Sequence, residues 1–377
     1  MLNDTLLFDR FRDAGTIRGL ADQIHHVAGK LHREVRVMEV CGGHTHTIMK
    51  YGLPQLMPSN VTFIHGPGCP VCVMPKERID HAAALAKAPE VILVTLGDMI
   101  KVPGSNGSLQ TVRAEGADVR FVYSPMDALK IAKENPGKTV IFFAIGFETT
   151  TPMTAALVQK TLSEGLTNLL FHINHITVPE PVAAIMDSGD AVIDAFIGPS
   201  HVSVITGSKI YAPLVARYHT PVVVAGFEPV DVMQGILMIL RQFDEGRCAL
   251  ENQYTRSVTY EGNTTAQKLI DTYFTRRPHF RWRGIGDIPH SALMLKEEYA
   301  HLDAEKVYRD ILPDTPIDDH KLCICGPILK GIAKPTDCKV FGTACTPKNP
   351  LGSCMVSSEG ACSAYYKYGG QLHVANR

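Results

Sequence analysis

Short apolar runs recur along the first 225 residues, and each is followed by a stretch rich in glycine, proline or polar residues. Runs of Val and Ile without polar alternation are typical of strands that are buried on both faces of a parallel sheet. Most runs are separated by one helix length of chain, which predicts βαβ units. We place eight strands, at residues 35–40, 61–65, 91–95, 119–123, 139–145, 169–173, 193–197 and 221–225.

Helical spacing of apolar residues appears in three places. Between residues 17 and 31 an apolar side chain recurs every three or four positions, so an amphipathic helix precedes the first strand. Further helices are predicted near residues 76–87 and 264–274, and after residues 125, 152 and 229. After about residue 247 the strand rhythm stops, and the tail from Cys323 onward is rich in cysteine, glycine and proline with little periodicity.

These patterns predict a protein of the α/β class with two small parallel-sheet domains, residues 35–124 and 125–247. The loops after parallel strands gather at the carboxyl edge of a sheet, so we expect the loop-bearing edges of both domains to face a shared cleft. Residues 1–34 and 248–377 are expected to form a third, irregular α+β domain that binds an iron–sulfur cluster.

The composition argues against several classes of function. The 377 residues carry a net charge of −1, which leaves no electrostatic footprint for nucleic acid or an anionic membrane. No apolar run reaches the roughly 18 residues that span a bilayer, and the charged N-terminus does not resemble a signal peptide. We therefore expect a soluble, cytoplasmic protein. Its ten cysteines then suit metal ligation or redox chemistry better than structural disulfides.

Six of the ten cysteines lie between residues 323 and 362. A zinc ribbon would show paired Cys-x-x-Cys knuckles, and this segment contains none. Widely spaced single cysteines on irregular loops favour a cubane iron–sulfur cluster that the chain wraps around, with structural zinc or unligated thiols as the alternatives. A cubane needs four ligands, so two of the six cysteines would be spare.

Two motifs follow the first two predicted strands, Cys41-Gly-Gly-His-Thr-His46 and Gly66-Pro-Gly-Cys-Pro-Val-Cys72. Glycine and proline give them little helical character, so we interpret both as loops at one edge of the sheet. A two-residue gap between cysteines permits a reversible disulfide, but half of a metal site or two buried thiols would share this spacing. The first motif has too few ligands to close a tetrahedron, which favours an open or shared metal site. The side chains expected to converge are Cys41, His44, His46, Cys69 and Cys72.

Other chemically interesting residues are more ambiguous. Glu148 and Glu228 each end a Gly-Phe-Glu sequence after a predicted strand, so they are candidate acids, bases or donor-positioning groups, or else carboxylates that stabilise a helix N-terminus. His201 follows a strand and is the histidine expected to face the cleft. Cys248 is interpreted as an inert thiol. The sequence Pro136-Gly-Lys-Thr139 precedes a strand and lacks the first glycine of a phosphate-binding loop, so we reject nucleotide binding there.

The motifs at residues 41–46 and 66–72, with Gly-Phe-Glu-Thr-Thr at 146–150, resemble those of the hydrogenase maturation factor HypD family, as does the tail from Phe341 to Cys362. The resemblance covers the whole chain. It implies two α/β domains, a third domain with a [4Fe-4S] cluster, and a role in building the Fe(CN)₂CO group of [NiFe]-hydrogenases. The implied partners are HypC, which shares the iron, and HypE, which delivers cyanide as a thiocyanate made with HypF. The hydrogenase large-subunit precursor would be served indirectly.

The resemblance also implies roles for particular residues. The cargo iron of Fe(CN)₂CO would be held between Cys41 and the N-terminal cysteine of HypC, with His44 as a further ligand or proton donor. Release of cyanide from a thiocyanate needs two electrons, which the Cys69/Cys72 dithiol can store. Our predicted cluster ligands are Cys325, Cys338, Cys345 and Cys362, with Cys323 and Cys354 as alternates or as a second redox pair.

Two other functions stay open on the sequence alone. The tail also resembles ferredoxin–thioredoxin reductase, in which a cluster lies beside a redox disulfide, so a thiol–disulfide reductase is one alternative. A scaffold whose cluster is purely architectural is the other. Iron retained outside the cluster would separate the maturation scaffold from the reductase, and redox titration of Cys69 and Cys72 would separate both from the third function. Whether the chain is itself an enzyme also stays open.

Overall fold

The apolar runs nearest the two ends of the predicted βαβ region pair with one another in the computed structural model, which describes residues 9–372. They form one fully parallel sheet, here called sheet A. Its strands, in spatial order, are β2 (Val61–His65), β1 (Val35–Glu39), β7 (Ala195–Pro199), β8 (Val222–Ala225) and β9 (Leu250–Asn252).

The runs between them form a second parallel sheet, here called sheet B. Its strands, in spatial order, are β4 (Val119–Val122), β3 (Val91–Leu96), β5 (Thr139–Gly146) and β6 (Leu169–His175). The central strand β5 is buried along its length, and its alternate residues enter two different apolar clusters, as the two-residue period of a strand requires. The predicted α/β class with two parallel-sheet units is therefore confirmed.

The strands that make up each sheet do not follow the expected domain boundaries. A division between residues 124 and 125 falls inside sheet B, because β3 pairs both with β4 before that point and with β5 after it. The chain leaves sheet A after β2, builds the whole of sheet B, and returns to sheet A with β7. Residues 250–252, which we expected in the third domain, add the last strand of sheet A.

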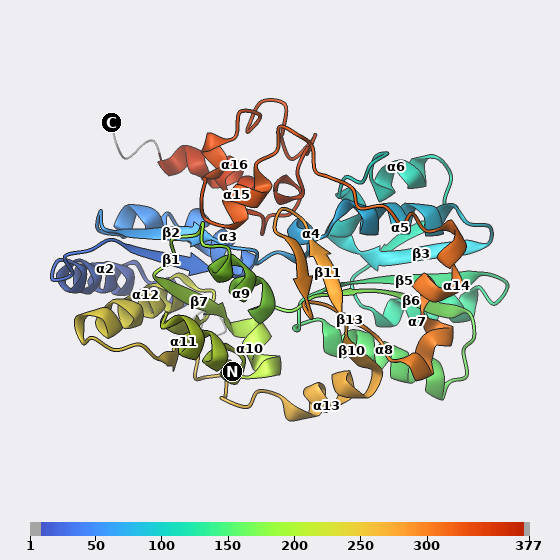
Figure 1. Cartoon of the computed structure of the whole chain (residues 1–377), viewed down its shortest axis with the longest axis horizontal. Helices are drawn as coiled ribbons and strands as arrows, with labels where there is room; N and C mark the ends of the chain where they lie inside the picture. Colours follow the sequence, from blue (N-terminus) through green and yellow to red (C-terminus); the bar gives the residue numbers. More distant parts are fainter. Residues whose placement is uncertain (1–8, 373–377) are drawn as a thin grey trace.

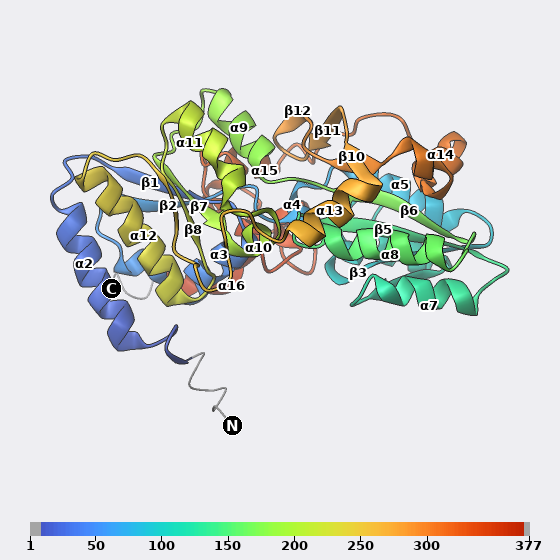
Figure 2. The ribbon, with the colours of Figure 1, turned by 90° about the horizontal axis from the view of Figure 1, so that it is seen from below.

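Helices cover both faces of each sheet. Three of the predicted helices are α2 (Ala14–Ala28), α5 (Lys76–Lys87) and α13 (Thr264–Tyr273), and those predicted after residues 125, 152 and 229 are α7 (Met126–Glu134), α8 (Thr151–Ser163) and α12 (Pro229–Asp244). On sheet A, α2 lies beside α12 on one face (Figure 2), and their apolar residues share a buried cluster with β1, β7 and β8. On sheet B, α7 and α8 cover one face, while α5 and α6 (Leu109–Ala114) cover the other.

The remaining helical segments are short. They are α3 (Gly42–Lys50), α4 (Pro70–Val73), α9 (Pro179–Asp187), α10 (Ser200–Thr206), α11 (Ala212–Tyr218), α14 (Ala304–Val307), and the 3-10 turns η1 (Leu53–Leu56), η2 (Gly97–Lys101), η3 (Ser208–Tyr211), η4 (Glu297–Leu302) and η5 (Arg309–Ile311).

The chain after β9 joins the two units. Two antiparallel pairs, β10 (Phe274–Arg276) with β13 (Leu293–Leu295) and β11 (His279–Trp282) with β12 (Gly286–Pro289), lie between the sheets (Figure 1). Residues 321–369, here called the C-terminal lobe, then pack on α3 and α4. The lobe contains α15 (Cys325–Leu329), η6 (Pro335–Asp337), η7 (Ser353–Met355) and most of α16 (Ala361–Leu372). Among residues 9–372, no helix combines the length and apolar character needed to cross a bilayer.

Candidate functional site

Both cysteine motifs begin helices, which corrects their interpretation as loops. Cys41 is the N-cap of α3, and its carbonyl accepts hydrogen bonds from the amides of His44 (2.9 Å) and Thr45 (3.2 Å). Cys69 is the N-cap of α4, whose first residue is a proline pre-set for a helix start. Both glycines after Cys41 are required by space, because a Cβ on Gly42 would lie 2.3 Å from the Cβ of Glu359 and one on Gly43 would lie 2.9 Å from the ring of Phe227. Tertiary contact thus overrides the low helix propensity of glycine.

The two motifs touch through their backbones. The amide of Gly42 donates to the carbonyl of Gly68 at 2.9 Å. A Cβ on Gly68 would lie 2.2 Å from the backbone nitrogen of Cys41, so only glycine fits at this position. The carboxyl ends of β1 and β2 therefore hold Cys41 and Cys69 next to each other, as neighbouring parallel strands predict.

The buried carboxylate of Glu39 forms hydrogen bonds that hold the turn at Cys41. One oxygen of Glu39 accepts from the amide of Cys41 at 3.0 Å, and the other accepts from Nδ1 of His65 at 2.7 Å and from the hydroxyl of Thr45. Burial raises the pKa of Glu39 while these hydrogen bonds lower it, and the net shift is upward. Sequence reasoning missed Glu39, although an acidic residue at the end of an apolar strand was a visible signal.

His44 is held as a neutral imidazole with one free nitrogen. Its Nε2 donates to the carbonyls of Ala225 (3.1 Å) and Gly226 (3.0 Å), while Nδ1 is buried without a partner. Burial lowers the pKa of His44 to about 4. An imidazole whose second nitrogen donates to a carbonyl is the usual arrangement of a metal-ligating histidine. His44 lies in the first turn of α3, three residues after the N-cap Cys41.

His201 and His46 lie in different surroundings. Phe227 lies against both His44 and His201, with ring centroids 4.5 Å and 4.4 Å away, so His201 joins the His44 side of the site. His46 instead packs edge-on against Tyr368 of α16 and does not join the convergence that we expected.

Glu148 brings an acidic group from sheet B to the same edge. Its Oε1 accepts from the amide of Val178 at 3.0 Å, and its Oε2 is buried without a partner. Burial raises the pKa of Glu148 to about 7. Burial also raises the pKa of Tyr211, and the charges of Glu148 and Cys41 raise it further. By contrast, Glu228 forms a bidentate ion pair with Arg12, so its carboxylate is not available as an acid or base.

The partial burial of Cys41 favours the protonated thiol in the free protein. Burial raises the pKa of the Cys41 thiol, and the negative charges of Glu359 and Glu39 raise it further. The thiol form is therefore favoured until a cation binds, because a coordinated metal ion removes the thiol proton outright.

The C-terminal lobe brings all six of its cysteines to the lining of one pocket. The sulfur atoms of Cys325 and Cys354 lie 2.8 Å apart. Burial raises the pKa of Cys362, and its neighbours Cys354, Cys323, Cys345 and Cys338 raise it further, so these thiols surround it. The predicted partition paired Cys354 with Cys323, whereas the geometry pairs it with Cys325.

The pocket connects to the Cys69–Cys72 motif through a row of thiols. Cys354 interacts through its side chain with Cys72 as well as with Cys325, and these hydrogen bonds lower the pKa of Cys354. The amide of Cys72 in turn donates to the sulfur of Cys69 at 3.3 Å. The hydroxyl of Ser353 donates to the carbonyl of Cys72 and ties the lobe to α4. The guanidinium of Arg283, a residue that sequence reasoning missed, is buried nearby and also lowers the pKa of Cys354.

In the described range, the pocket thiols are not arranged as a preformed site for a single tetrahedral ion. In a tetrahedral zinc site, with Zn–S bonds of about 2.3 Å, the sulfurs lie roughly 3.8 Å apart. Within residues 9–372, no three cysteine sulfurs lie within 4.8 Å of one another. The one compact ligand group of that kind in this range, His81 with His172 and Glu305, is already occupied by its own hydrogen bonds and by two arginines.

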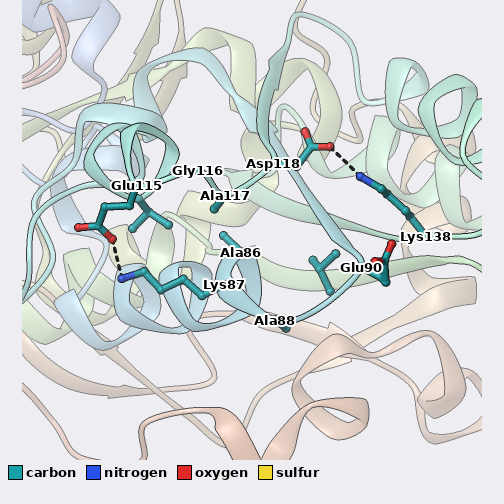
Figure 3. Close-up of a pocket in the computed structure, with 11 residues that line it drawn as sticks. Ala86, Lys87, Ala88, Glu90, Glu115, Gly116, Ala117, Asp118 and Lys138 are labelled. Carbon is teal, nitrogen blue, oxygen red and sulfur yellow. Dashed lines mark ion pairs between the residues drawn. The ribbon is translucent and has the colours of Figure 1, made fainter.

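A larger pocket lies at the opposite, amino-terminal edge of sheet B (Figure 3). Its charged residues pair with one another, Lys87 with Glu115 at 2.8 Å and Lys138 with Asp118 at 3.5 Å. None of the predicted site residues lines this pocket, and we assign it no chemistry.

The protein is therefore a cysteine-rich two-sheet α/β protein. The carboxyl edges of its sheets carry a buried imidazole and thiols, and its C-terminal lobe contains a six-cysteine pocket. The sequence matches a family profile, HypD, described as "Hydrogenase formation hypA family", over residues 15–369. The hydrogenase expression/formation protein HupD of Azotobacter chroococcum mcd 1 is 52% identical over 97% of this chain and 98% of its own. The hydrogenase maturation factor HypD of Escherichia coli (strain K12) is 46% identical over 93% of this chain and 94% of its own. The chain belongs to the HypD family.

Proposed function

We propose that the chain is a hydrogenase maturation factor that serves as the redox-active scaffold on which the Fe(CN)₂CO unit is assembled. The observation that carries this proposal is the unbroken row of thiols from the six-cysteine pocket, through Cys354 and Cys72, to the edge that holds Cys41. Hydrogenase maturation itself follows from the family and from the names of its members.

The cargo iron is held at Cys41 and His44. The Cys41 thiolate is a soft ligand suited to a low-spin ferrous ion with cyanide and carbonyl ligands. The unpartnered Nδ1 of His44 is a second candidate ligand, oriented by the two carbonyls that bind Nε2. The amino end of α3 also favours an anionic complex. Two protein ligands leave the iron incomplete, so a thiolate from HypC completes the site.

The pocket would hold a [4Fe-4S] cluster through Cys323, Cys338, Cys345 and Cys362. This set follows from the contact between Cys325 and Cys354, which leaves those two sulfurs as a redox pair between the cluster and Cys72. It revises the predicted set, which contained Cys325 in place of Cys323. When bound, such a cluster supplies electrons one at a time.

The Cys69/Cys72 dithiol would release cyanide from the thiocyanate that HypE carries. One cysteine attacks the thiocyanate sulfur, cyanide leaves, and the second cysteine resolves the mixed disulfide. The dithiol loses two electrons and two protons in this step. One proton goes to the sulfur of HypE, and the other is available to Glu148, whose pKa near 7 suits proton transfer at neutral pH. The freed cyanide binds the iron.

Infrared spectroscopy of the complex with HypC tests the cargo site. Cyanide and carbonyl bound to iron absorb where protein is nearly silent, so we expect their bands in the wild-type complex. Cys41→Ala should lose the bands and keep the brown colour of the cluster, and Cys41→Ser should do little better because a hydroxyl binds soft iron poorly. Cys248→Ala, at an exposed cysteine, is the matched control. Retention of the bands by Cys41→Ala would refute this cargo site.

Iron and sulfide analysis of anaerobically purified variants tests the assignment of the six pocket cysteines. We expect about four iron and four sulfide per chain in the wild type. Cys338→Ala and Cys345→Ala should bleach the protein and loosen the lobe, because ligation is part of folding there. Cys325→Ala and Cys354→Ala should keep the full iron content and lose maturation activity. A bleached Cys325→Ala protein with an intact Cys323→Ala protein would restore the set predicted from the sequence.

The alternative function, a thiol–disulfide reductase, has the same row of thiols in its favour. Cys69 and Cys72 are only 3% and 1% exposed, so a protein disulfide meets the same barrier as the HypE thiocyanate, and access does not separate the two functions. Reduction of a protein disulfide by the wild type, without any iron held outside the cluster, would favour the reductase.

A further inference from the structure

The charge of the chain is unevenly distributed. The C-terminal lobe contains six lysines and two acidic residues, which gives it a net charge of +4, while the whole chain carries −1. Residues outside the lobe therefore sum to −5. The lysines of the lobe are Lys321, Lys330, Lys334, Lys339, Lys348 and Lys367.

These lysines are also unneutralised. Five of the six are exposed, and none forms an ion pair with another residue of the described range 9–372. By contrast, eight of the thirteen lysines outside the lobe are ion-paired. The lobe therefore presents a positive potential to the solvent.

Large apolar side chains are exposed on the same lobe. Leu322, Ile332 and Tyr366 are 54%, 52% and 45% exposed, and Phe341 lies edge-on to Tyr366 with ring centroids 6.3 Å apart. An apolar centre with a charged rim is the usual composition of a protein–protein interface. The lobe packs on α3 and α4 through α16 and η7, so its exposed lysines and apolar side chains lie on the surface that these contacts leave free, here called its outer face.

We propose that the outer face of the C-terminal lobe is the docking surface for an acidic one-electron carrier protein. The inference rests on the proposed function, in which each cyanide release leaves Cys69 and Cys72 as a disulfide. Its reduction to two thiols takes two electrons and two protons. Two reduced carriers, docking in turn, each give one electron and leave oxidised, and the protons come from solvent.

The geometry favours entry through the lobe. A carrier cannot reach the buried Cys69 and Cys72 directly, whereas Cys323, Cys338 and Cys362 are only partly buried in the lobe itself. Opposite charge steers such transient encounters and raises their rates by about 10- to 1,000-fold. Nucleic acid also binds positive surfaces, but its phosphate backbone would not be stabilised by contact with the exposed apolar side chains of Leu322 and Ile332, which a protein surface can bury.

The test measures binding of a purified acidic 2[4Fe-4S] ferredoxin, in its oxidised form, to the full-length protein by calorimetry. Between about 0.01 M and about 0.15 M salt the Debye length falls from about 30 Å to about 8 Å, so the dissociation constant should rise about tenfold or more. The triple variant Lys321→Gln, Lys339→Gln and Lys348→Gln should bind about tenfold more weakly at low salt and lose most of the salt dependence. The control triple Lys130→Gln, Lys160→Gln and Lys268→Gln, exposed on the sheet B side, should bind like the wild type.

A second readout follows electron transfer in stopped flow. The rate at which reduced ferredoxin bleaches the brown protein should fall with the lobe triple variant, while bleaching by excess dithionite should still go to completion. Unchanged ferredoxin binding in the lobe variant, or tighter binding of duplex DNA than of ferredoxin at the same salt, would overturn the inference alone. A colourless wild-type protein without infrared bands in its HypC complex would overturn the proposed function and this inference together.

Discussion

Glu148 shows how burial alone can shift the protonation of a side chain. A carboxylate without a hydrogen-bond partner is poorly solvated in the interior, so burial favours the protonated form. Oε2 of Glu148 has no partner, and its pKa is raised to about 7. The group is therefore divided between its two forms at neutral pH, which suits the proton transfer that we propose for it.

The same shift predicts a dependence of stability on pH. Because the folded pKa lies above the unfolded value, the stability contribution is full at low pH and is lost as pH rises through about 7. Glu148→Gln removes this loss, so between pH 5 and pH 8 the variant should gain roughly 2–3 kcal/mol relative to the wild type. Urea unfolding followed by the fluorescence of the single tryptophan, Trp282, measures it. Glu134→Gln, at an exposed helix end, is the control, and parallel pH profiles for all three proteins would contradict the buried, protonatable state.

The sequence predicted which types of residue form the site and which strand ends carry them. It did not predict the direction in which each side chain points. Cys41 and His44 lie where the end of a buried strand placed them. The failure at His46 follows from the assignment of a loop to a helical segment. In a helix of 3.6 residues per turn, a position five residues after Cys41 points away from it, and His46 packs on α16.

At the scale of elements, the close approach of the two motifs depends on Gly68. A methyl group there would lie 2.2 Å from the backbone nitrogen of Cys41, and backbone cannot swing aside as a long side chain can. Gly68→Ala should therefore displace the Cys41 turn, cost about 1–3 kcal/mol of stability, and weaken the cargo bands while the cluster colour is kept. Gly137→Ala, with open space at its Cβ, is the control. Full-strength bands in Gly68→Ala would show that the turn tolerates the shift.

Elements with strong periodicity were predictable and those governed by tertiary contact were not. The helix predicted at residues 76–87 matches α5, because its apolar positions repeat at helical spacing. Helix α3 begins with two glycines, each unfavourable by about 1 kcal/mol relative to alanine, so local propensity argued against it. Its start is stabilised by contacts with Gly68 and Phe227, which lie far away in the sequence.

At the scale of the whole molecule, chain order concealed which strands share a sheet. All eight predicted strands exist, but β7 pairs with β1 across more than 150 residues. Strand pattern specifies that a run is buried in a parallel sheet and does not specify its neighbours, because every such run is similarly apolar. The boundary near residue 124 followed from assuming that neighbours in sequence are neighbours in space.

A buried charge network connects the segment after β9 to sheet B and so fixes this joint between the two parts of the chain. Glu305 of α14 accepts ion pairs from Arg78 of α5 and from Arg277, and Arg78 also donates to Asn174 of β6 at 2.6 Å. Burial opposes ionisation, but the two guanidiniums hold the pKa of Glu305 well below its usual range. The segment after β9 is thereby fastened to sheet B.

Removing the shared carboxylate should loosen this joint far more than removing an exposed one. Glu305→Gln leaves Arg78, which is 6% exposed, without its charge partner, and the loss of one member of a buried pair costs about 3–5 kcal/mol. Glu297→Gln, which breaks the exposed pair with Lys306, should cost about 0–1 kcal/mol. Hydrogen exchange should then rise across both β6 and α14 in Glu305→Gln and stay unchanged in Glu297→Gln. If the two variants unfolded at the same urea concentration with the same exchange pattern, the network would be incidental, and the packing of Leu295 and Leu302 against sheet B would have to hold the joint alone.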